Sequence, residues 1–246
     1  MKLSLVIPCY NEEKNIEPFM KCCIETFGNN KNIEYIFIND GSKDNTFLEI
    51  KKIIEKYKNE NILGISFSRN FGKEAAMLAG LKKSKGEFTA LIDADLQQHP
   101  KYVKQMLEYI EGHDEYDCVT CYQEKRKEGK LLIWLKERFY SLINKISDVE
   151  FYKNASDFRL FNRKVLNSIL DMEEYYRFSK GLFSYIGYNT YYMSYEVNER
   201  KYGKSSWSLF GLFKYAINGI IGFSVAPLKL ATILGLITMI LSLIYI

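Results

Sequence analysis

The stretch FTALIDADLQ, residues 88–97, decides both the fold and the chemistry expected of this chain. Its first five residues are mostly apolar and stop at a charged residue, which predicts a short buried strand over Phe88–Ile92. Asp93 and Asp95 follow directly, and residues two apart in extended backbone point to the same side. Two carboxylates placed in this way suit Mg²⁺ or Mn²⁺ that is shared with substrate phosphates. The stretch therefore predicts a strand that ends in a candidate metal site.

The first half of the chain repeats this arrangement, with short apolar runs separated by helical patterns. The predicted strands are Leu3–Ile7, Tyr35–Ile38, Ile62–Ser66, Phe88–Ile92 and Cys118–Cys121. The predicted helices between them are Ile16–Phe27, Thr46–Tyr57, Lys73–Ser84 and Pro100–Ile110. Strands that alternate with helices are typical of a parallel sheet covered on its faces. We therefore expect an α/β fold with a mostly parallel sheet flanked by helices.

Polar residues follow the first four of these strands. They occupy residues 8–12 (PCYNE), 39–42 (NDGS), 69–73 (RNFGK) and 93–97 (DADLQ). In such sheets, ligands bind beyond the carboxyl ends of the strands. Asp40 also has a simpler reading as part of a turn, because Asp bonds to the local backbone and the following Gly allows positive φ. We expect three aspartates and Glu12 to face one another at this edge, as carboxylates do in functional sites.

Composition excludes several classes of protein. The chain has 246 residues, 47% hydrophobic and 15% aromatic, which is enough to build a full core. Its net charge of +4, from 34 basic and 30 acidic residues, is too balanced for a nucleic-acid binder. Five cysteines without a secretory framework favour a reducing compartment. Cys118 and Cys121 have CxxC spacing, but they lie in a strand-like stretch without a second pair, so we expect ordinary buried thiols.

The second half of the chain changes character. Apolar residues recur at helical spacing between residues 131 and 146, which predicts an amphipathic helix in the core or on a membrane surface. A similar stripe lies within residues 207–225. The run from Leu230 to Ile246 carries no charge and approaches the roughly 20 residues that span a bilayer. We therefore predict a catalytic domain over 1–206, a juxtamembrane segment over 207–225 and a transmembrane helix over 226–246, with a buried core helix as the alternative.

The two ends of the chain bear on its location. The first apolar run stops at Pro8, too early for a signal peptide, so the catalytic domain is expected to stay on the cytoplasmic face of the cell membrane. Basic residues before the last apolar run agree with that orientation. The last run reaches the final residue. Either further transmembrane helices follow in a longer protein, or a second copy supplies a partner helix and makes a homo-oligomer.

Six ordered motifs across nearly the whole chain resemble those of family-2 glycosyltransferases with the Rossmann-like GT-A fold. Within that family they are most similar to polyprenyl-phosphate glycosyltransferases, the class of bactoprenol glucosyltransferases and dolichol-phosphate mannose synthases. The motifs lie at residues 8–12, 39–42, 68–73, 93–97, 157–160 (DFRL) and 200–205 (RKYGKS). One departure is Asn39, where the family usually has Asp, which leaves the base preference open. Another is Gln98-His99-Pro100, where the family usually has Asp-Pro, a minor surface change.

The resemblance assigns roles to individual residues. A nucleotide-sugar donor would contact Pro8, Tyr10, Glu12, Ile38, Asp40, Asp93, Ala94, Gln97, Arg200 and Lys204. Mg²⁺ or Mn²⁺ would be held by Asp93, Asp95 and Gln97. Arg200 and Lys204 would close over the donor phosphates. They also read as a solvated basic stretch that sets membrane topology, and both readings are compatible.

Asp157 and Arg159 are harder to weigh, because an Asp and an Arg between apolar residues often form an internal ion pair. The resemblance places Asp157 beside the acceptor, as a catalytic base or an orienting group. Asp95, on the metal side, and Arg159 are the other residues expected to be catalytic. A phosphate monoester is already largely an anion at neutral pH, since its second pKa is about 6, so a strong base is dispensable. Our hypothesis is that Asp157 positions the acceptor or the sugar, and that Arg159 or Arg126 binds the acceptor phosphate.

The implied reaction is inverting transfer of a sugar from a nucleotide diphosphate, with UDP-glucose or UDP-N-acetylglucosamine favoured, to undecaprenyl phosphate in the membrane. One alternative is a GDP-mannose-using enzyme like the dolichol-phosphate mannose synthases. A second extends a polysaccharide, although the Gln-x-x-Arg-Trp motif of processive synthases does not occur in the sequence. A third is a non-catalytic module that only binds nucleotide sugars, against which the intact aspartates argue.

Overall fold

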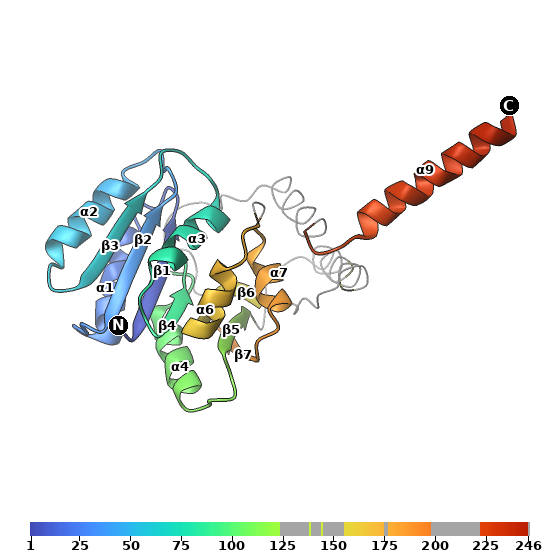
Figure 1. The fold of residues 1–246 in the computed structure, drawn as a ribbon. Helices are drawn as coiled ribbons and strands as arrows, with labels where there is room; N and C mark the ends of the chain where they lie inside the picture. Colours follow the sequence, from blue (N-terminus) through green and yellow to red (C-terminus); the bar gives the residue numbers. More distant parts are fainter. Residues whose placement is uncertain (124–137, 139–143, 145–154, 175–176, 198–221, 246) are drawn as a thin grey trace. The chain divides into compact units, whose positions relative to one another are not determined.

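The computed structural model describes residues 1–123, 138, 144, 155–174, 177–197 and 222–245 (Figure 1). The chain divides into two compact units. The first unit is Met1–Arg126 with Asn154–Ser205, and the second is Lys127–Lys153 with Ser206–Ile246. Most of the amphipathic helix predicted over 131–146 and most of the stripe over 207–225 lie outside the described residues.

The first unit contains a seven-stranded sheet in the order β3-β2-β1-β4-β6-β5-β7. Its strands are β1 (Leu3–Cys9), β2 (Ile33–Asn39), β3 (Asn61–Ser66), β4 (Phe88–Leu91), β5 (Cys118–Gln123), β6 (Ala155–Asn162) and β7 (Thr190–Tyr195). Its helices are α1 (Ile16–Phe27), α2 (Thr46–Lys56), α3 (Lys73–Lys83), α4 (Pro100–Glu111), α6 (Arg163–Leu170) and α7 (Ser179–Tyr185). The five strands and four helices predicted from the sequence are confirmed, with ends that differ by a few residues at most.

The sheet is parallel except around β6. Strands β1, β2, β3 and β4 run in one direction, and β5 pairs with β7 in parallel, whereas β6 is antiparallel to both β4 and β5. The chain order reverses at β1, which has β2 on one side and β4 on the other. This switch point is where open α/β sheets bind ligands. The expectation of a mostly parallel sheet is thus confirmed, and β6 and β7 are additions that the sequence did not predict.

Both faces of the central strands are buried, which explains why they read as continuous apolar runs. One face packs against α1, α2 and α4 in a core that includes Leu5, Phe19, Phe37 and Val103. The other face packs against α3. At Gly80 of α3, an added Cβ would lie 2.4 Å from a Val6 side-chain carbon, so only glycine permits this close approach. The last turns of α3 are therefore held close against the sheet.

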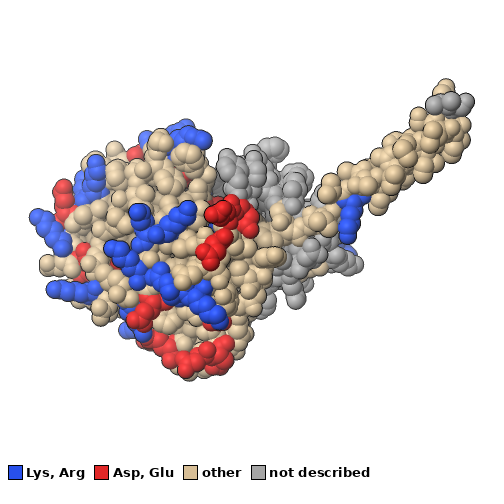
Figure 2. Space-filling view, in the orientation of Figure 1, with Lys and Arg blue, Asp and Glu red and all other residues tan. Residues whose placement is uncertain are grey.

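In the second unit, helix α9 (Ala226–Tyr245) has one charged residue, Lys229. Large apolar side chains are exposed along it, including Leu236, Ile240 and Ile244. Figure 2 shows basic and acidic residues interspersed on the first unit, in contrast to the nearly uncharged helix. Within the described residues, no helix combines the length and the hydropathy that crossing a bilayer requires. The transmembrane helix expected over 226–246 is thus not confirmed.

Candidate active site

The antiparallel strand β6 brings its first residues to the carboxyl end of β4. Leu91 at the end of β4 is paired with Arg159 in β6. Continuing this register by two residues places Asp93 opposite Asp157. Two residues more than sixty positions apart in the chain therefore meet at one edge of the sheet, beside the switch point.

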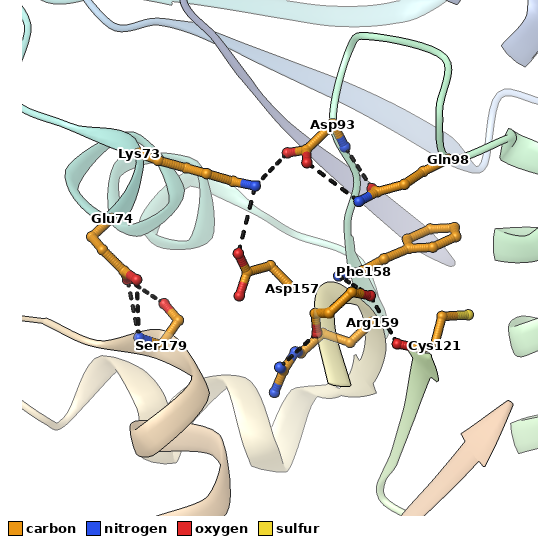
Figure 3. A network of polar contacts seen from close by, with 10 residues as sticks. Lys73, Glu74, Asp93, Gln98, Cys121, Asp157, Phe158, Arg159 and Ser179 are labelled. Carbon is orange, nitrogen blue, oxygen red and sulfur yellow. Dashed lines mark hydrogen bonds and ion pairs between the residues drawn. The ribbon is translucent and has the colours of Figure 1, made fainter. Parts of the chain in front are cut away.

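Lys73 joins these two carboxylates. Its Nζ lies 2.6 Å from Asp93 Oδ1 and 3.6 Å from Asp157 Oδ2 (Figure 3). The three side chains are 20–31% exposed, so the group is partly shielded from solvent. The second oxygen of Asp157, Oδ1, is buried and accepts no hydrogen bond among the described residues. The site is thus a lysine between two carboxylates, with one acceptor left over.

Asp40 fixes the backbone that carries Lys73. Its Oδ1 accepts a hydrogen bond from Phe71 N at 2.7 Å, and its Oδ2 accepts one from Gly72 N at 3.0 Å. The neighbouring Gly41 has a φ of +59°, and a Cβ there would lie 2.2 Å from the Arg69 carbonyl carbon. The loops after β2 and β3 therefore touch, and glycine is required where they do. Burial raises the pKa of Asp40, against the lowering effect of these two hydrogen bonds.

The loop after β4 is held by its own side chains. Gln98 Oε1 accepts from Asp93 N at 2.9 Å, and Gln98 Nε2 donates to Asp93 Oδ2 at 3.3 Å. Asp95 Oδ1 accepts from Gln97 N at 3.1 Å. Leu96 has a φ of +60°, a left-handed conformation that a bulky residue adopts only where its surroundings enforce it. Such strain gathers at functional sites, and here it lies directly after the two aspartates.

Electrostatics separates the two carboxylates that share Lys73. Burial raises the pKa of Asp93, and the negative charges of Asp95 and Asp157 add to this, against the opposing effect of Lys73. Burial would also raise the pKa of Asp157, but positive neighbours outweigh it and hold that pKa below its ordinary value. Those neighbours are Lys73, Lys180 and Arg159. Of these two carboxylates, Asp157 is therefore the one held more firmly as an anion.

The carboxylates fit a hard divalent cation only in part. Among the described residues, no three side chains of the His, Cys, Asp or Glu type are grouped so that they could hold a metal ion. Asp93 and Asp95 offer oxygen ligands, which Mg²⁺ and Mn²⁺ prefer, and both cations normally complete their shell with substrate phosphates and water. The oxygen set at this edge thus suits a cation that arrives together with a diphosphate.

Arg159 does not lie open to an acceptor. It is 4% exposed, its Nη2 donates to Ser156 O at 3.0 Å, and its guanidinium stacks 4.1 Å from the Phe183 ring centroid. Its Nε has no hydrogen-bond partner among the described residues. The role predicted for Arg159 in binding an acceptor phosphate stays a prediction, and the group that the arginine serves in this structure is the Asp157 carboxylate, by its charge.

The donor residues implied by the resemblance are spread over different environments. Pro8 and Tyr10 are half-buried at the end of β1 and just beyond it, and Gln97 is half-buried in the loop after β4. Ile38 is fully buried and Ala94 is 2% exposed, so their side chains present almost no surface to a ligand. The contacts proposed for these five residues stay predictions.

The expectation that three aspartates and Glu12 face one another needs correction. The charge of Asp95 helps to raise the pKa of Asp93, but the Asp40 carboxylate turns to the loop after β3. Glu12 accepts from Asn15 Nδ2 in its own loop. The reason is that backbone N–H groups and amides in these loops need acceptors, which the two carboxylates supply.

Asn39, the departure from the family motif, has both ends of its amide engaged. Its Oδ1 accepts from Ser42 N at 3.1 Å, and its Nδ2 donates to Ser66 Oγ at 2.9 Å. An amide donates and accepts at once, and it adds no second negative charge beside Asp40. Arg126, Arg200 and Lys204 lie outside the described residues, so their predicted phosphate contacts stay predictions.

The sequence assigned no role to Lys73 or Glu74. The interpretation of Gln98 as part of a minor surface change is wrong, because Gln98 is 8% exposed and its amide bonds to Asp93. Glu74 accepts hydrogen bonds from Ser179 N at 3.1 and 3.2 Å and from the Ser179 hydroxyl, which ties the start of α3 to the start of α7 (Figure 3). The available signal for Lys73 was its place in the polar stretch after the third strand. Its partners could not be read from the sequence, because they lie in the loop after β4 and on β6.

Comparisons of the sequence with known proteins identify the family of this chain. The family model for glycosyl transferase family 2 matches residues 4–170. A bactoprenol glucosyl transferase of Shigella phage SfX is 36% identical over 248 residues, which cover 100% of this chain and 80% of that protein.

Solved structures show the same fold at low identity. Staphylococcus aureus TarS residues 1–349 superpose with a TM-score of 0.56 at 20% identity, over 80% of this chain and 59% of that one. Glucosyl-3-phosphoglycerate synthase from Mycobacterium tuberculosis, in complex with Mn²⁺, UDP-glucose and phosphoglyceric acid, gives 0.57 at 17% identity, over 88% and 76%. These likenesses confirm the expected GT-A type of fold. The family model covers about two thirds of this chain, and a relative that aligns with all of it is 36% identical. The chain therefore belongs to glycosyl transferase family 2 and is a glycosyltransferase.

Proposed function

We propose that the enzyme transfers a sugar, with inversion, from a nucleotide diphosphate donor to a polyprenyl phosphate such as undecaprenyl phosphate. The observation that carries this proposal is the pairing of Asp93 with Asp157 through Lys73 at the sheet edge. In this arrangement Asp93 offers an oxygen ligand to a cation that binds with the donor, and Asp157 offers a negative charge beside the acceptor. The full-length relative named as a bactoprenol glucosyl transferase supports the choice of acceptor.

In the proposed reaction, an acceptor phosphate oxygen forms the bond to the anomeric carbon as the bond to the leaving diphosphate breaks. The nucleoside diphosphate leaves from the opposite face, so one displacement inverts the configuration. The acceptor needs no base, because a phosphate monoester is already largely ionised near neutral pH. Asp157 orients the acceptor or a sugar hydroxyl, since its neighbours keep it charged.

Asp95, with Asp93 and Gln97, would hold Mg²⁺ or Mn²⁺ on the donor side. When bound, the cation supplies positive charge against the growing negative charge of the diphosphate. The Mn²⁺ and UDP-glucose complex of the M. tuberculosis neighbour supports this cation and a UDP-sugar donor, for which glucose or N-acetylglucosamine is favoured. We also propose that Arg200 and Lys204 contact the diphosphate and that Arg126 or Arg159 contacts the acceptor phosphate.

Membrane attachment is part of this proposal, because a polyprenyl acceptor resides in the bilayer. The exposed apolar side chains of α9 would bind the membrane, with the first unit on the cytoplasmic face. Replacement of Leu236 and Ile240, one helical turn apart, by Lys should reduce flotation of the full chain with lipid vesicles. Lys229→Gln serves as the matched control, and unchanged flotation of the double variant would remove α9 from this role.

The test of the reaction is transfer of labelled sugar from a panel of UDP- and GDP-sugars to undecaprenyl phosphate in detergent with Mg²⁺. Label extracted into the lipid phase from one UDP-sugar supports the proposal. Label from GDP-mannose alone selects the mannose-synthase alternative. Label in a polymer selects the polysaccharide alternative, and nucleotide binding without transfer to any acceptor selects the non-catalytic module.

A further inference from the structure

Lys73 occupies a position where an enzyme that uses a divalent cation has reason to avoid a fixed positive charge. Its ammonium lies 2.6 Å from Asp93 Oδ1, an oxygen proposed as a cation ligand. Within the described part of the chain, it is the one cation within ion-pair distance of both Asp93 and Asp157. A divalent cation and this ammonium cannot both sit on the same oxygen, because like charges repel at contact distance.

The backbone of Lys73 is fixed while its side chain is not. Asp40 holds the two N–H groups just before it, and Glu74, just after it, is bonded to Ser179. The loop is therefore poorly placed to move as a whole. A lysine side chain has four rotatable carbon bonds, so the ammonium can leave Asp93 without any change in the loop.

We propose that Lys73 is a positioning residue that acts as an internal stand-in cation: it blocks Asp93 in the absence of donor and moves to the donor diphosphate when a divalent cation takes Asp93. This role rests on the proposed function, because it needs a diphosphate donor. The negative diphosphate gives the released ammonium a new partner. Asp157 keeps Lys180 and Arg159 as positive neighbours after the exchange.

The exchange couples two binding events. Without nucleotide, a divalent cation must displace Lys73 from Asp93 and leave it only the longer ion pair with Asp157, so the cation binds weakly. With a nucleoside diphosphate present, the same displacement creates a new ion pair, so the cation binds tightly. By linkage, the cation must strengthen nucleotide binding by the same factor. The chain would thus avoid holding a metal ion at an empty donor site.

The test is a titration of the full chain in detergent with Mn²⁺, first alone and then with saturating UDP. Calorimetry or electron paramagnetic resonance measures the affinity for Mn²⁺ in each case. Lys73→Met should bind Mn²⁺ alone roughly tenfold more tightly than the wild type, and the gain from UDP should shrink by a similar factor, within the usual range of coupling between sites. Lys73→Arg keeps the charge and should keep weak binding of Mn²⁺ alone. Lys83→Met, at the exposed end of the same helix, should change neither value.

Unchanged or weaker binding of Mn²⁺ alone to Lys73→Met would overturn the proposal, as would a UDP effect equal to that of the wild type. Thermal unfolding of each variant identifies any loss of fold, and Lys73→Gln, which also removes the charge, then carries the test with the result expected for Lys73→Met. Because Mn²⁺ binding without nucleotide involves no turnover, these results stand apart from the sugar-transfer assay. If the wild type transfers no sugar from any donor, the proposed function is wrong. If UDP strengthens Mn²⁺ binding equally in Lys73→Met and in the wild type, only the role of Lys73 is wrong.

Discussion

The loop after β4 and the first residues of β6 reach the same lysine from two sides, with opposite surroundings. Asp93, in the loop, lies near two other carboxylates, and its pKa is raised by burial and by their charges. Asp157, in the strand, lies near three cations, which lower its pKa despite its burial. Chemically identical groups thus acquire different roles from their neighbours. Asp93 is suited to exchange one cation for another, and Asp157 is suited to remain an anion.

The largest effects should come from neutralising these two carboxylates separately. Asp157→Asn should lower kcat by about 100-fold or more, because a misoriented acceptor loses that much, and should leave UDP affinity unchanged. Asp93→Asn should instead weaken binding of Mn²⁺ together with UDP, since it removes a charged oxygen ligand. Steady-state kinetics and UDP titrations measure the two effects. If both variants altered the same parameter equally, the division of roles between loop and strand would be wrong.

A smaller effect should follow from Asp40→Ala, which removes the support of the loop that presents Lys73. The change leaves two part-buried backbone N–H groups without their acceptor and should lower the free energy of unfolding by roughly 1–3 kcal/mol. Urea unfolding measures it. The matched comparison is Asp44→Ala, which removes another carboxylate of the loop after β2. Asp44 accepts from Glu13 N and Thr46 N and makes no bond to Phe71 N or Gly72 N. An Asp40 variant with the stability and the UDP affinity of the wild type would show that the loop does not depend on this carboxylate.

The smallest effects are in the pH dependence of stability, and they should have opposite signs. Asp157 has a lowered folded-state pKa, so its contribution is present above the ordinary value of 3.8 and is lost as pH falls through the folded value. Asp93 has a raised folded-state pKa, so the folded chain loses stability as pH rises from 3.8 through the raised value. Unfolding of the metal-free wild type, Asp157→Asn and Asp93→Asn from about pH 2.5 to 7 measures both slopes. Slopes of the same sign would contradict the contrast between the two carboxylates.

The same two regions show how far the sequence could be read. The loop after β4 was predictable, because an apolar strand followed by two aspartates is a local pattern, and the bounds of β1 to β5 followed from similar patterns. The pairing of Asp157 with Asp93 was not, because it depends on β6 running antiparallel beside β4. Nothing in the short stretch around Asp157 specifies its partner strand. Lys73 could be placed at a strand end, but its ion pairs depend on that same long-range pairing.

Burial was also hard to predict from motifs alone. The resemblance pointed to Ile38 and Arg159 as contact residues, whereas the structure places Ile38 in the core and Arg159 against Phe183. A motif contains the residues that accompany a function, and some of them stabilise the loops of the site. Asp40 gives such support here, because its carboxylate is used by the loop that carries Lys73, and its predicted donor contact stays a prediction.

The central claim is that the carboxylates at this edge of the sheet hold a cation that serves sugar transfer. The most direct measurement is the rate of label transfer to undecaprenyl phosphate after exhaustive chelation with EDTA, and again after Mg²⁺ or Mn²⁺ is restored. The account predicts that transfer stops without the cation and returns with it in the wild type, while Asp95→Asn stays inactive in both conditions. Transfer at the full rate after chelation would contradict it.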